Sequence, residues 1–179
     1  MKIGKTVFDR DEMFKINCEK LAERGVKIEQ IAEVAYKQQS RYNSAIKLED
    51  CVKSVEKILS LRDTFHILLI GVELDKLAEQ GKLSSPLNDI LVADLGMFGV
   101  DEILGLEIAG NYGVIGRTNF GDIDVNKPGI VNDLNETGKK GVVCHTFLDD
   151  IVGAIAAAAS TRVAQELTEN IARGEVSKK

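Results

Sequence analysis

The segment from Phe147 to Arg173 places the strongest constraint on the fold, because it is the longest stretch of the chain with a helix-favouring composition. It contains no proline and is rich in alanine, the residue with the highest helix propensity. The alanines at Ala156–Ala159 also favour close packing of helices, within the chain or between subunits. No segment of the chain shows convincing alternation of apolar and polar residues. The sequence therefore predicts an all-α fold.

Shorter helices are predicted before this segment from apolar residues spaced three and four positions apart. The chain has only two prolines, Pro86 and Pro128, which is compatible with long uninterrupted helices. A strand at His66–Val72 is the competing interpretation of one short apolar run. The predicted helices cover Asp9–Arg24, Ile28 to about Tyr42, Leu48–Leu61, Thr64–Gln80 and Ser84 to about Asp94.

Length and charge limit the class of protein. A chain of 179 residues predicts one compact domain spanning 1–179, with N-terminal helices in 1–61. The 23 lysines and arginines against 28 aspartates and glutamates give a net charge of −5, which argues against binding to nucleic acid and against attraction to an anionic membrane. The apolar runs are far shorter than the roughly 20 residues that cross a bilayer, and the N-terminus lacks the apolar region of a signal peptide. We therefore expect a cytoplasmic protein.

One short pattern occurs twice in the second half of the chain. The sequences VDEILG at 100–105 and LDDIVG at 148–153 share the order apolar, acid, acid, isoleucine, aliphatic, glycine. An alanine follows four residues after each glycine. Residues at i, i+4 and i+8 share a helix face, so two such helices can approach closely along their small residues. The acids of the two copies would then meet at one end of the contact.

Four carboxylates in one place repel each other and raise one another's pKa values, a conflict that a divalent cation removes. Oxygen ligands without histidine or cysteine suit Mg²⁺ best, and such a site usually completes its ligand set with water and substrate phosphate. Asp101, Glu102, Asp149 and Asp150 are therefore the predicted metal ligands and catalytic residues. The alternative is structural, because acids in a first turn also stabilise the helix dipole and the free N–H groups.

The passage Gly110–Gly129 lies between the two acidic pairs and has an unusual composition. Glycine recurs throughout 96–141, which predicts irregular backbone or very close helix contacts. We expect an ordered connection with positive φ at several positions. A loop that cradles phosphate with Arg117, Asn119 and Lys127 is the functional alternative, although the passage contains neither a Walker A motif nor a Rossmann fingerprint.

The motifs VDEILG, NKPG and FLDDIVGAIAAAA, in this order, resemble the phosphatidylglycerophosphatase A family. The similarity is closest to its soluble Gram-positive branch, the YutG-like and low-temperature-requirement C proteins, and extends from about Asn88 to Arg162. It implies a compact helical fold in which residues 147–173 form a central helix surrounded by others. Typical members are membrane-integral and carry a glycine- and proline-rich N-terminal motif, and this chain resembles them in neither respect.

The resemblance also implies an activity, the Mg²⁺-dependent removal of the terminal phosphate of phosphatidylglycerol phosphate in phospholipid synthesis. It places Asp101 and Glu102 on the first acidic motif of the family and Asp149 and Asp150 on the second. Lys127 falls in the KPG turn between the two motifs.

Together these observations predict a phosphoric monoester hydrolase with its site in residues 86–173. Lys127, Arg117 and His145 are the candidates for stabilising phosphate charge, with helix capping as the alternative role of His145. The substrate would be a phospholipid headgroup or another small phosphomonoester, with at most peripheral membrane contact. The alternatives are a Mg²⁺-dependent phosphatase of a soluble metabolite and a non-catalytic helical binding or scaffold protein. A homo-oligomer is compatible with the alanine-rich packing surface.

Overall fold

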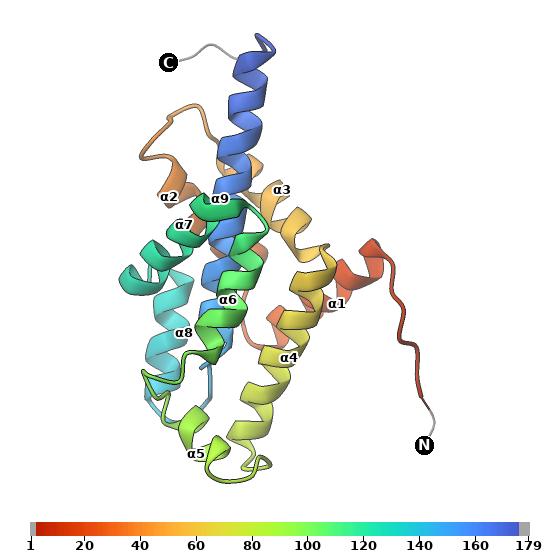
Figure 1. The fold of residues 1–179 in the computed structure, drawn as a ribbon, viewed down its shortest axis with the longest axis vertical. Helices are drawn as coiled ribbons and strands as arrows, with labels where there is room; N and C mark the ends of the chain where they lie inside the picture. Colours follow the sequence, from red (N-terminus) through yellow and green to blue (C-terminus); the bar gives the residue numbers. More distant parts are fainter. Residues whose placement is uncertain (1–2, 176–179) are drawn as a thin grey trace.

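The computed structural model describes residues 3–175, which fold into helices joined by short connections (Figure 1). No β-strand occurs within these residues, which confirms the all-α prediction. The alternative of a strand at 66–72 is wrong, because these residues lie in the middle of a helix. The helices are α1 (Arg10–Glu23), α2 (Ile28–Gln39), α3 (Leu48–Leu59), α4 (Arg62–Glu79), α5 (Leu87–Val92), α6 (Val100–Gly110), α7 (Gly113–Asn126), α8 (Ile130–Lys139) and α9 (Leu148–Ala172).

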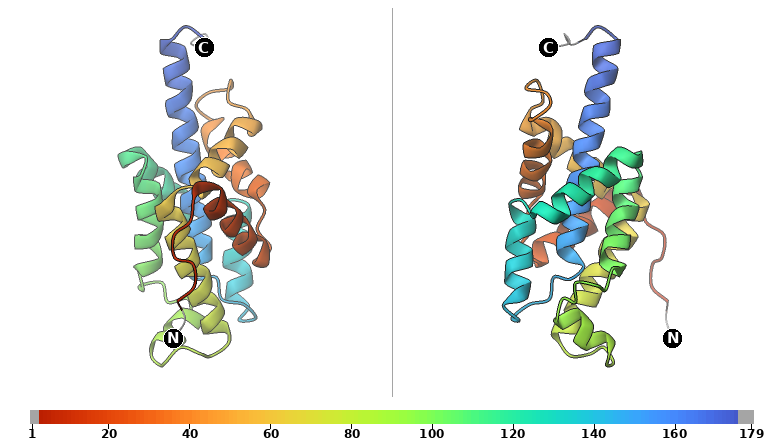
Figure 2. Two further views of the ribbon diagram at one scale, coloured as in Figure 1. Left: turned by 90° about the vertical axis from the view of Figure 1, so that its right-hand side faces the viewer. Right: turned by 60° about the vertical axis from the view of Figure 1, so that its left-hand side comes forward.

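Helix α9 is the central helix, as predicted. It packs against α2, α3, α4, α6, α7 and α8, and it runs through the middle of the ribbon in every view (Figures 1 and 2). Every residue from Leu148 to Thr161 is buried. A helix whose residues are apolar or small on all faces can be covered on all faces, which explains this burial. Beyond Val163 the helix is more exposed, and its last turns project from the body (Figure 1).

The N-terminal helices form near the ranges that their apolar periodicity predicts. Helix α1 begins with a capping box, in which the Asp9 carboxylate accepts the Glu12 N–H and the Glu12 side chain accepts the Asp9 N–H. Helix α2 ends at Gln39, earlier than predicted, and α5 is a short helix that starts after Pro86. Helix α8 has no counterpart among the sequence predictions.

Most of the glycine-rich passage between the acidic pairs is helical, so the prediction of an irregular connection there is wrong, whereas the alternative of very close helix contacts is confirmed. Residues Gly113–Asn126 form α7, and positive φ values occur only around its ends, at Gly113, Lys127 and Gly129. Inside the helix, Gly116 permits close packing. A Cβ on Gly116 would lie 2.1 Å from the carbonyl oxygen of Ala109, so α6 and α7 approach at a distance that only glycine permits.

The two glycines of the repeated pattern make room for one aromatic ring. A Cβ on Gly105 of α6 would lie 2.5 Å from Cζ of Phe120, which belongs to α7. A Cβ on Gly153 of α9 would lie 3.2 Å from Cγ2 of Ile123 and 3.7 Å from Cε2 of the same Phe120 ring. The small residues therefore join three helices, α6, α7 and α9, rather than α6 and α9 alone.

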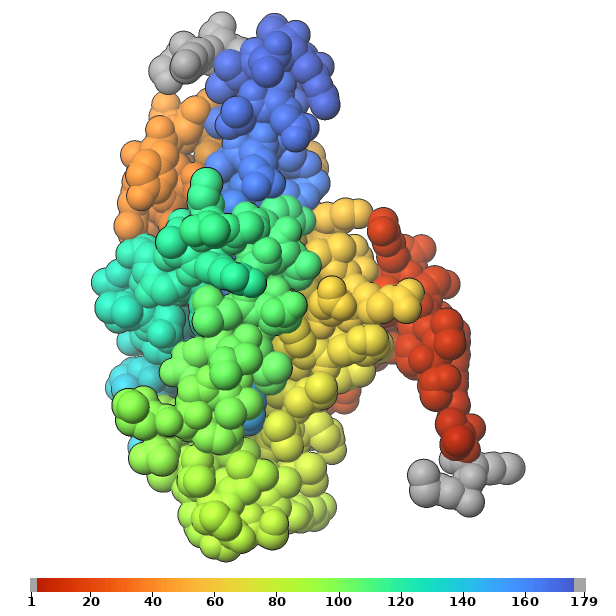
Figure 3. Space-filling model, in the orientation of Figure 1, coloured from red at the N-terminus to blue at the C-terminus, as the bar shows by residue number. Residues whose placement is uncertain are grey.

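The outer surface is formed largely by the helices that surround α9. In the space-filling view, α6 lies on the visible face between α4 and α7 (Figure 3). The exposed apolar side chains Val100 and Ile103 belong to this helix. Among the described residues, no helix combines the length and the apolar character needed to cross a membrane.

Candidate metal and phosphate site

The first turns of α6 and α9 bring the two acidic pairs together. Asp101 and Glu102 lie in the first turn of α6, and Asp149 and Asp150 lie in the first turn of α9. One carboxylate oxygen from each of Asp101, Glu102 and Asp150 lies within 4.8 Å of the other two. Asp101 and Asp150 are buried, and Glu102 is half-buried. The repeated pattern thus places three acids from two helices around one point.

The electrostatics of this acidic triad (Asp101, Glu102 and Asp150) are unfavourable without a cation. Burial raises the pKa of Asp101 to about 7, and the neighbouring Glu102 carboxylate adds to the increase. Burial raises the pKa of Asp150 to about 9, with a further contribution from Asp149. Oε2 of Glu102 is buried and has no hydrogen-bond partner among residues 3–175. A buried oxygen of this kind costs stability unless a donor or an ion satisfies it.

Lys127 lies beside the triad at the end of α7, where its backbone adopts a left-handed conformation with φ of 41°. Its ammonium nitrogen is 2.8 Å from Asp124, 3.0 Å from Asp149 and 3.2 Å from Asp150. Burial alone would lower the pKa of Lys127, but the carboxylates of Asp149, Asp124 and Asp150 raise it above its ordinary value. The lysine is therefore charged, and it neutralises part of the acidic site.

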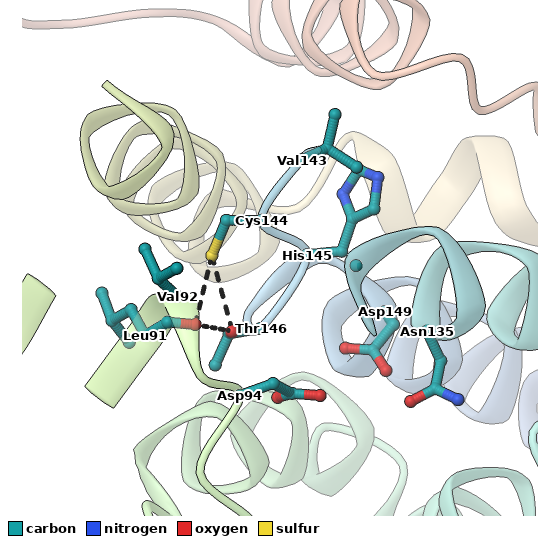
Figure 4. A pocket seen from close by; sticks show the side chains of 10 residues that line it. Leu91, Val92, Asp94, Asn135, Val143, Cys144, His145, Thr146 and Asp149 are labelled. Atoms are coloured by element: carbon teal, nitrogen blue, oxygen red, sulfur yellow. Dashed lines mark hydrogen bonds between the residues drawn. The ribbon is translucent and has the colours of Figure 1, made fainter. Parts of the chain in front are cut away.

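Asp149 faces Lys127 on one side and a small pocket on the other. This pocket has room for about one water molecule and is lined by Asp94, Asn135, His145 and Asp149, among others (Figure 4). Burial raises the pKa of Asp149 to about 6, while Lys127 opposes the increase. Burial lowers the pKa of His145 to about 4, assisted by the nearby Arg24, so the imidazole is neutral at pH 7.

The alternative role of the four acids, binding the free N–H groups of a helix start, is seen for only two of them. Oδ1 of Asp101 accepts the Glu102 N–H at 3.1 Å, and Oδ1 of Asp149 accepts the Asp150 N–H at 2.9 Å. The first acid of each pair thus satisfies a free N–H of its helix. Within residues 3–175 the carboxylates of Glu102 and Asp150 accept no backbone N–H. Both of these second acids belong to the triad, and Asp101 belongs to it as well as accepting a backbone N–H.

Arg117 and Asn119 lie away from the acids. The Arg117 guanidinium packs over Gly110 at the C-terminal end of α6, whereas the acids occupy the first turn of that helix. At 1.5 Å per residue this is a separation of roughly 13 Å along the helix. The Asn119 amide donates to the hydroxyls of Ser160 and Thr161 on α9, where it joins two helices. Because α7 is a helix rather than a loop, it carries these two side chains away from Lys127.

Asp124 belongs to the site although the sequence predictions gave it no role. It lies three residues before Lys127, the C-cap residue of α7, and the two side chains form an ion pair of 2.8 Å. The three-residue spacing of Asp124 and Lys127 could have indicated an ion pair at a helix end. This signal was missed because an irregular passage was predicted there.

The side chains present suit a hard divalent cation. All the ligand atoms of the triad are carboxylate oxygens, the donors that Mg²⁺ and Mn²⁺ prefer, and the unpartnered Glu102 oxygen is one of them. Asp101, Glu102 and Asp150 are the residues that could hold the ion. Lys127 and Asp149 lie next to it, where a cationic side chain can contact a phosphate and a carboxylate can accept a proton.

The chain is similar to known proteins over most of its length. YutG of Bacillus subtilis strain 168, an uncharacterized protein, is 48% identical over 145 residues, which cover 81% of this chain and 86% of YutG. The crystal structure of the low temperature requirement C protein from Listeria monocytogenes superposes with a TM-score of 0.84 at 47% identity, covering 87% of this chain and 97% of that one. The crystal structure of YpjQ from Bacillus subtilis gives a TM-score of 0.85 at 43% identity, covering 90% and 99%.

A protein-family model named PgpA and described as "Phosphatidylglycerophosphatase A" matches residues 31–165. The match includes α6, α7 and the first turns of α9, and therefore every residue of the acidic triad and Lys127. Sequence, fold and family model lead to one conclusion: the chain belongs to the phosphatidylglycerophosphatase A family.

Proposed function

We propose that the protein is a Mg²⁺-dependent phosphomonoesterase that removes the terminal phosphate of phosphatidylglycerol phosphate. The observation that carries this proposal is the acidic triad, in which carboxylate oxygens of two helices lie within 4.8 Å of one another beside a charged lysine. Such an arrangement is unfavourable by itself and becomes favourable when a cation and a phosphate bind together.

Each residue of the site has a proposed task. Asp101, Glu102 and Asp150 hold the ion, which when bound neutralises phosphate oxygens and orients the reacting groups. Lys127 turns its ammonium group from the carboxylates towards the phosphate and stabilises its charge. Asp149, with a pKa of about 6 and a position outside the triad, accepts the proton of an attacking water molecule. The water oxygen bonds to phosphorus as the ester P–O bond breaks, and the leaving alkoxide takes the proton from Asp149 and departs as the alcohol.

A lipid substrate is favoured by the surface next to the acids. Val100 and Ile103 flank Asp101 and Glu102 in the sequence, and 42% and 62% of their respective surfaces are exposed. Exposed apolar side chains at the edge of a charged site suit a substrate that combines a phosphate with an apolar part. A soluble phosphate ester would gain nothing from these residues.

The test is phosphate release from phosphatidylglycerol phosphate in mixed micelles, with Mg²⁺ and with a chelator. We expect Mg²⁺-dependent release by the wild type and loss of release in Asp150→Asn. Asp122→Asn is the matched control, because it makes the same chemical change on α7 in an exposed side chain whose nearest ion pair is with Arg41. Glycerol 3-phosphate serves as the soluble substrate.

Release from the lipid alone supports the proposal, and preferential release from glycerol 3-phosphate would replace it with a phosphatase of soluble metabolites. If no phosphate is released from either substrate at any Mg²⁺ concentration, the protein is a non-catalytic member of the family. Full activity of Asp150→Asn would show that the triad is not the site.

A further inference from the structure

The start of α9 is held by carboxylates from a different helix. Asp75 of α4 accepts the Phe147 N–H with Oδ1 at 3.1 Å and the Leu148 N–H with Oδ2 at 3.0 Å. Oδ1 also accepts the Cys144 thiol at 3.6 Å. The Asp75 side chain is fully buried. A buried carboxylate requires partners, and here both of its oxygens are used by the same short segment of backbone.

Asp75 replaces the cap that the sequence around α9 does not supply. The first N–H groups of a helix have no partner inside the helix, and they are usually satisfied by a side chain at the N-cap position. The N-cap of α9 is Phe147, which has no side chain for this purpose. The carboxylate of Asp75 fills the role from 72 residues away in the sequence.

A second carboxylate, one helical turn further along α4, fixes the residues that lead into α9. Oε1 of Glu79 accepts the Cys144 N–H at 2.8 Å. Arg24, the C-cap residue of α1, pairs with Glu79 and also donates to the Cys144 carbonyl oxygen at 2.8 Å. The backbone from Cys144 to Leu148 is thus attached to α4 at three N–H groups, and Asp149 and Asp150 follow directly.

We infer that Asp75 is a positioning residue for the metal site, and that it sets the orientation of Asp149 and Asp150 by fixing the first turn of α9. This inference rests on the proposed function. Metal sites tolerate displacements of only about 0.5 Å in their ligands, and groups that orient the ligands affect affinity by roughly 10- to 100-fold. The acids on α6 receive no comparable support, since the N-cap of α6 is Gly99.

The experiment measures Mn²⁺ affinity by isothermal titration calorimetry and amide exchange by mass spectrometry, at a temperature at which circular dichroism shows every variant to be folded. Asp75→Asn keeps the shape of the side chain but presents an amide N–H₂ to one of the two backbone N–H groups. We expect about tenfold weaker Mn²⁺ binding and faster amide exchange in peptides covering 144–150 in the absence of metal. Glu79→Gln is the milder second variant, with a decrease of about threefold.

Ser54→Ala is the matched control. It removes a buried hydrogen bond of 2.9 Å to the carbonyl of Ala159, further along the same helix α9. We expect it to lower the melting temperature without changing the Mn²⁺ affinity, which separates positioning from general stability. Wild-type affinity in Asp75→Asn overturns the inference and leaves the proposed function intact. If Asp75→Asn does not fold, unchanged affinity in Glu79→Gln overturns it.

The two proposals fail in different ways. A wild type that binds Mn²⁺ but releases no phosphate contradicts the proposed function, while weakened binding in Asp75→Asn still supports the inference. A wild type that binds no Mn²⁺ contradicts both.

Discussion

The first turns of α6 and α9 carry the same short sequence pattern but lie in different surroundings. The α9 turn is buried, its leading N–H groups are bound by Asp75, and its two acids share the charge of Lys127. The α6 turn follows a glycine, itself carries the exposed apolar residues Val100 and Ile103, and includes a buried Glu102 oxygen without a described partner. One copy is therefore rigid and partly neutralised, and the other is left with an unsatisfied ligand atom. The same pattern acquires different tasks from the elements packed against it.

The largest expected effect is on Mn²⁺ affinity and comes from replacing single acids in the first turn of α9. Asp150 belongs to the triad, whereas Asp149 is paired with Lys127 and lies outside it. Asp150→Asn should weaken Mn²⁺ binding by more than about 100-fold, because even groups that only orient ligands affect affinity by 10- to 100-fold. Asp149→Asn should have a much smaller effect on affinity. Equal losses in the two variants, measured by calorimetry, would contradict the division of roles between neighbouring acids.

The next largest effect is on stability and concerns Lys127, whose charge neutralises the acids of the α9 turn. Lys127→Met removes the only described cationic partner of Asp149 and Asp150 from a half-buried site and should lower the free energy of unfolding of the metal-free protein by about 2 kcal/mol. Mg²⁺ should then stabilise the variant more than it stabilises the wild type, because the ion takes over the neutralisation. Thermal unfolding with and without Mg²⁺ provides the measurement.

Lys127→Arg keeps the charge and Lys139→Met removes an exposed lysine that pairs with Glu136 on the surface, so both should remain close to the wild type in stability. A Lys127→Met variant as stable as these controls would mean that the acids of α9 do not depend on the lysine.

The two glycines of the repeated pattern provide a third way to compare the copies. A methyl group on Gly105 would lie 2.5 Å from the Phe120 ring, and one on Gly153 would lie 3.2 Å from a terminal methyl of Ile123. Gly105→Ala should therefore cost about 1–3 kcal/mol through overpacking, whereas in Gly153→Ala the higher helix propensity of alanine, worth about 1 kcal/mol, should offset most of the strain. Urea unfolding measures both. A Gly153→Ala variant less stable than Gly105→Ala would contradict the packing described for Phe120.

Features that depend on a local sequence pattern were predictable, whereas features that depend on contacts between helices were not. The long C-terminal helix and the meeting of the acids follow from helix-favouring composition and from a repeated pattern, both of which can be seen in the residues themselves, whereas the central position of that helix was implied by the family resemblance. Helix α7 was missed because glycine disfavours a helix locally, while Gly116 is required there by its tertiary contact with Ala109. The cap of α9 could not be predicted from its own sequence, because Asp75 reaches it from α4.

The smallest expected effect is the pH dependence of stability, in which the triad and His145 act in opposite directions. Folding raises the pKa values of Asp101 and Asp150 from 3.8 to about 7 and about 9, so the folded protein binds more protons than the unfolded chain and loses stability as the pH rises through this range. Folding lowers the pKa of His145 from 6.5 to about 4, which increases stability with pH between these values. Burial likewise raises the pKa of Asp75 on α4 to about 8. Between pH 6.5 and 9 the buried carboxyl groups of Asp101, Asp150 and Asp75 therefore lower the stability as the pH rises, and His145 does not contribute.

In this window the metal-free protein should lose a few degrees of melting temperature, and saturating Mg²⁺ should remove the part of the loss that the triad causes, since the ion replaces the protons on its carboxylates. Scans of the wild type and of Asp101→Asn at pH 6.5 and 9 provide the measurement. The variant should show a shallower decline, because an amide does not ionise. If the decline is the same in both proteins and persists with Mg²⁺, then the carboxylates of the α6 turn and the α9 turn do not share one cation, and the two copies of the pattern are independent helix starts.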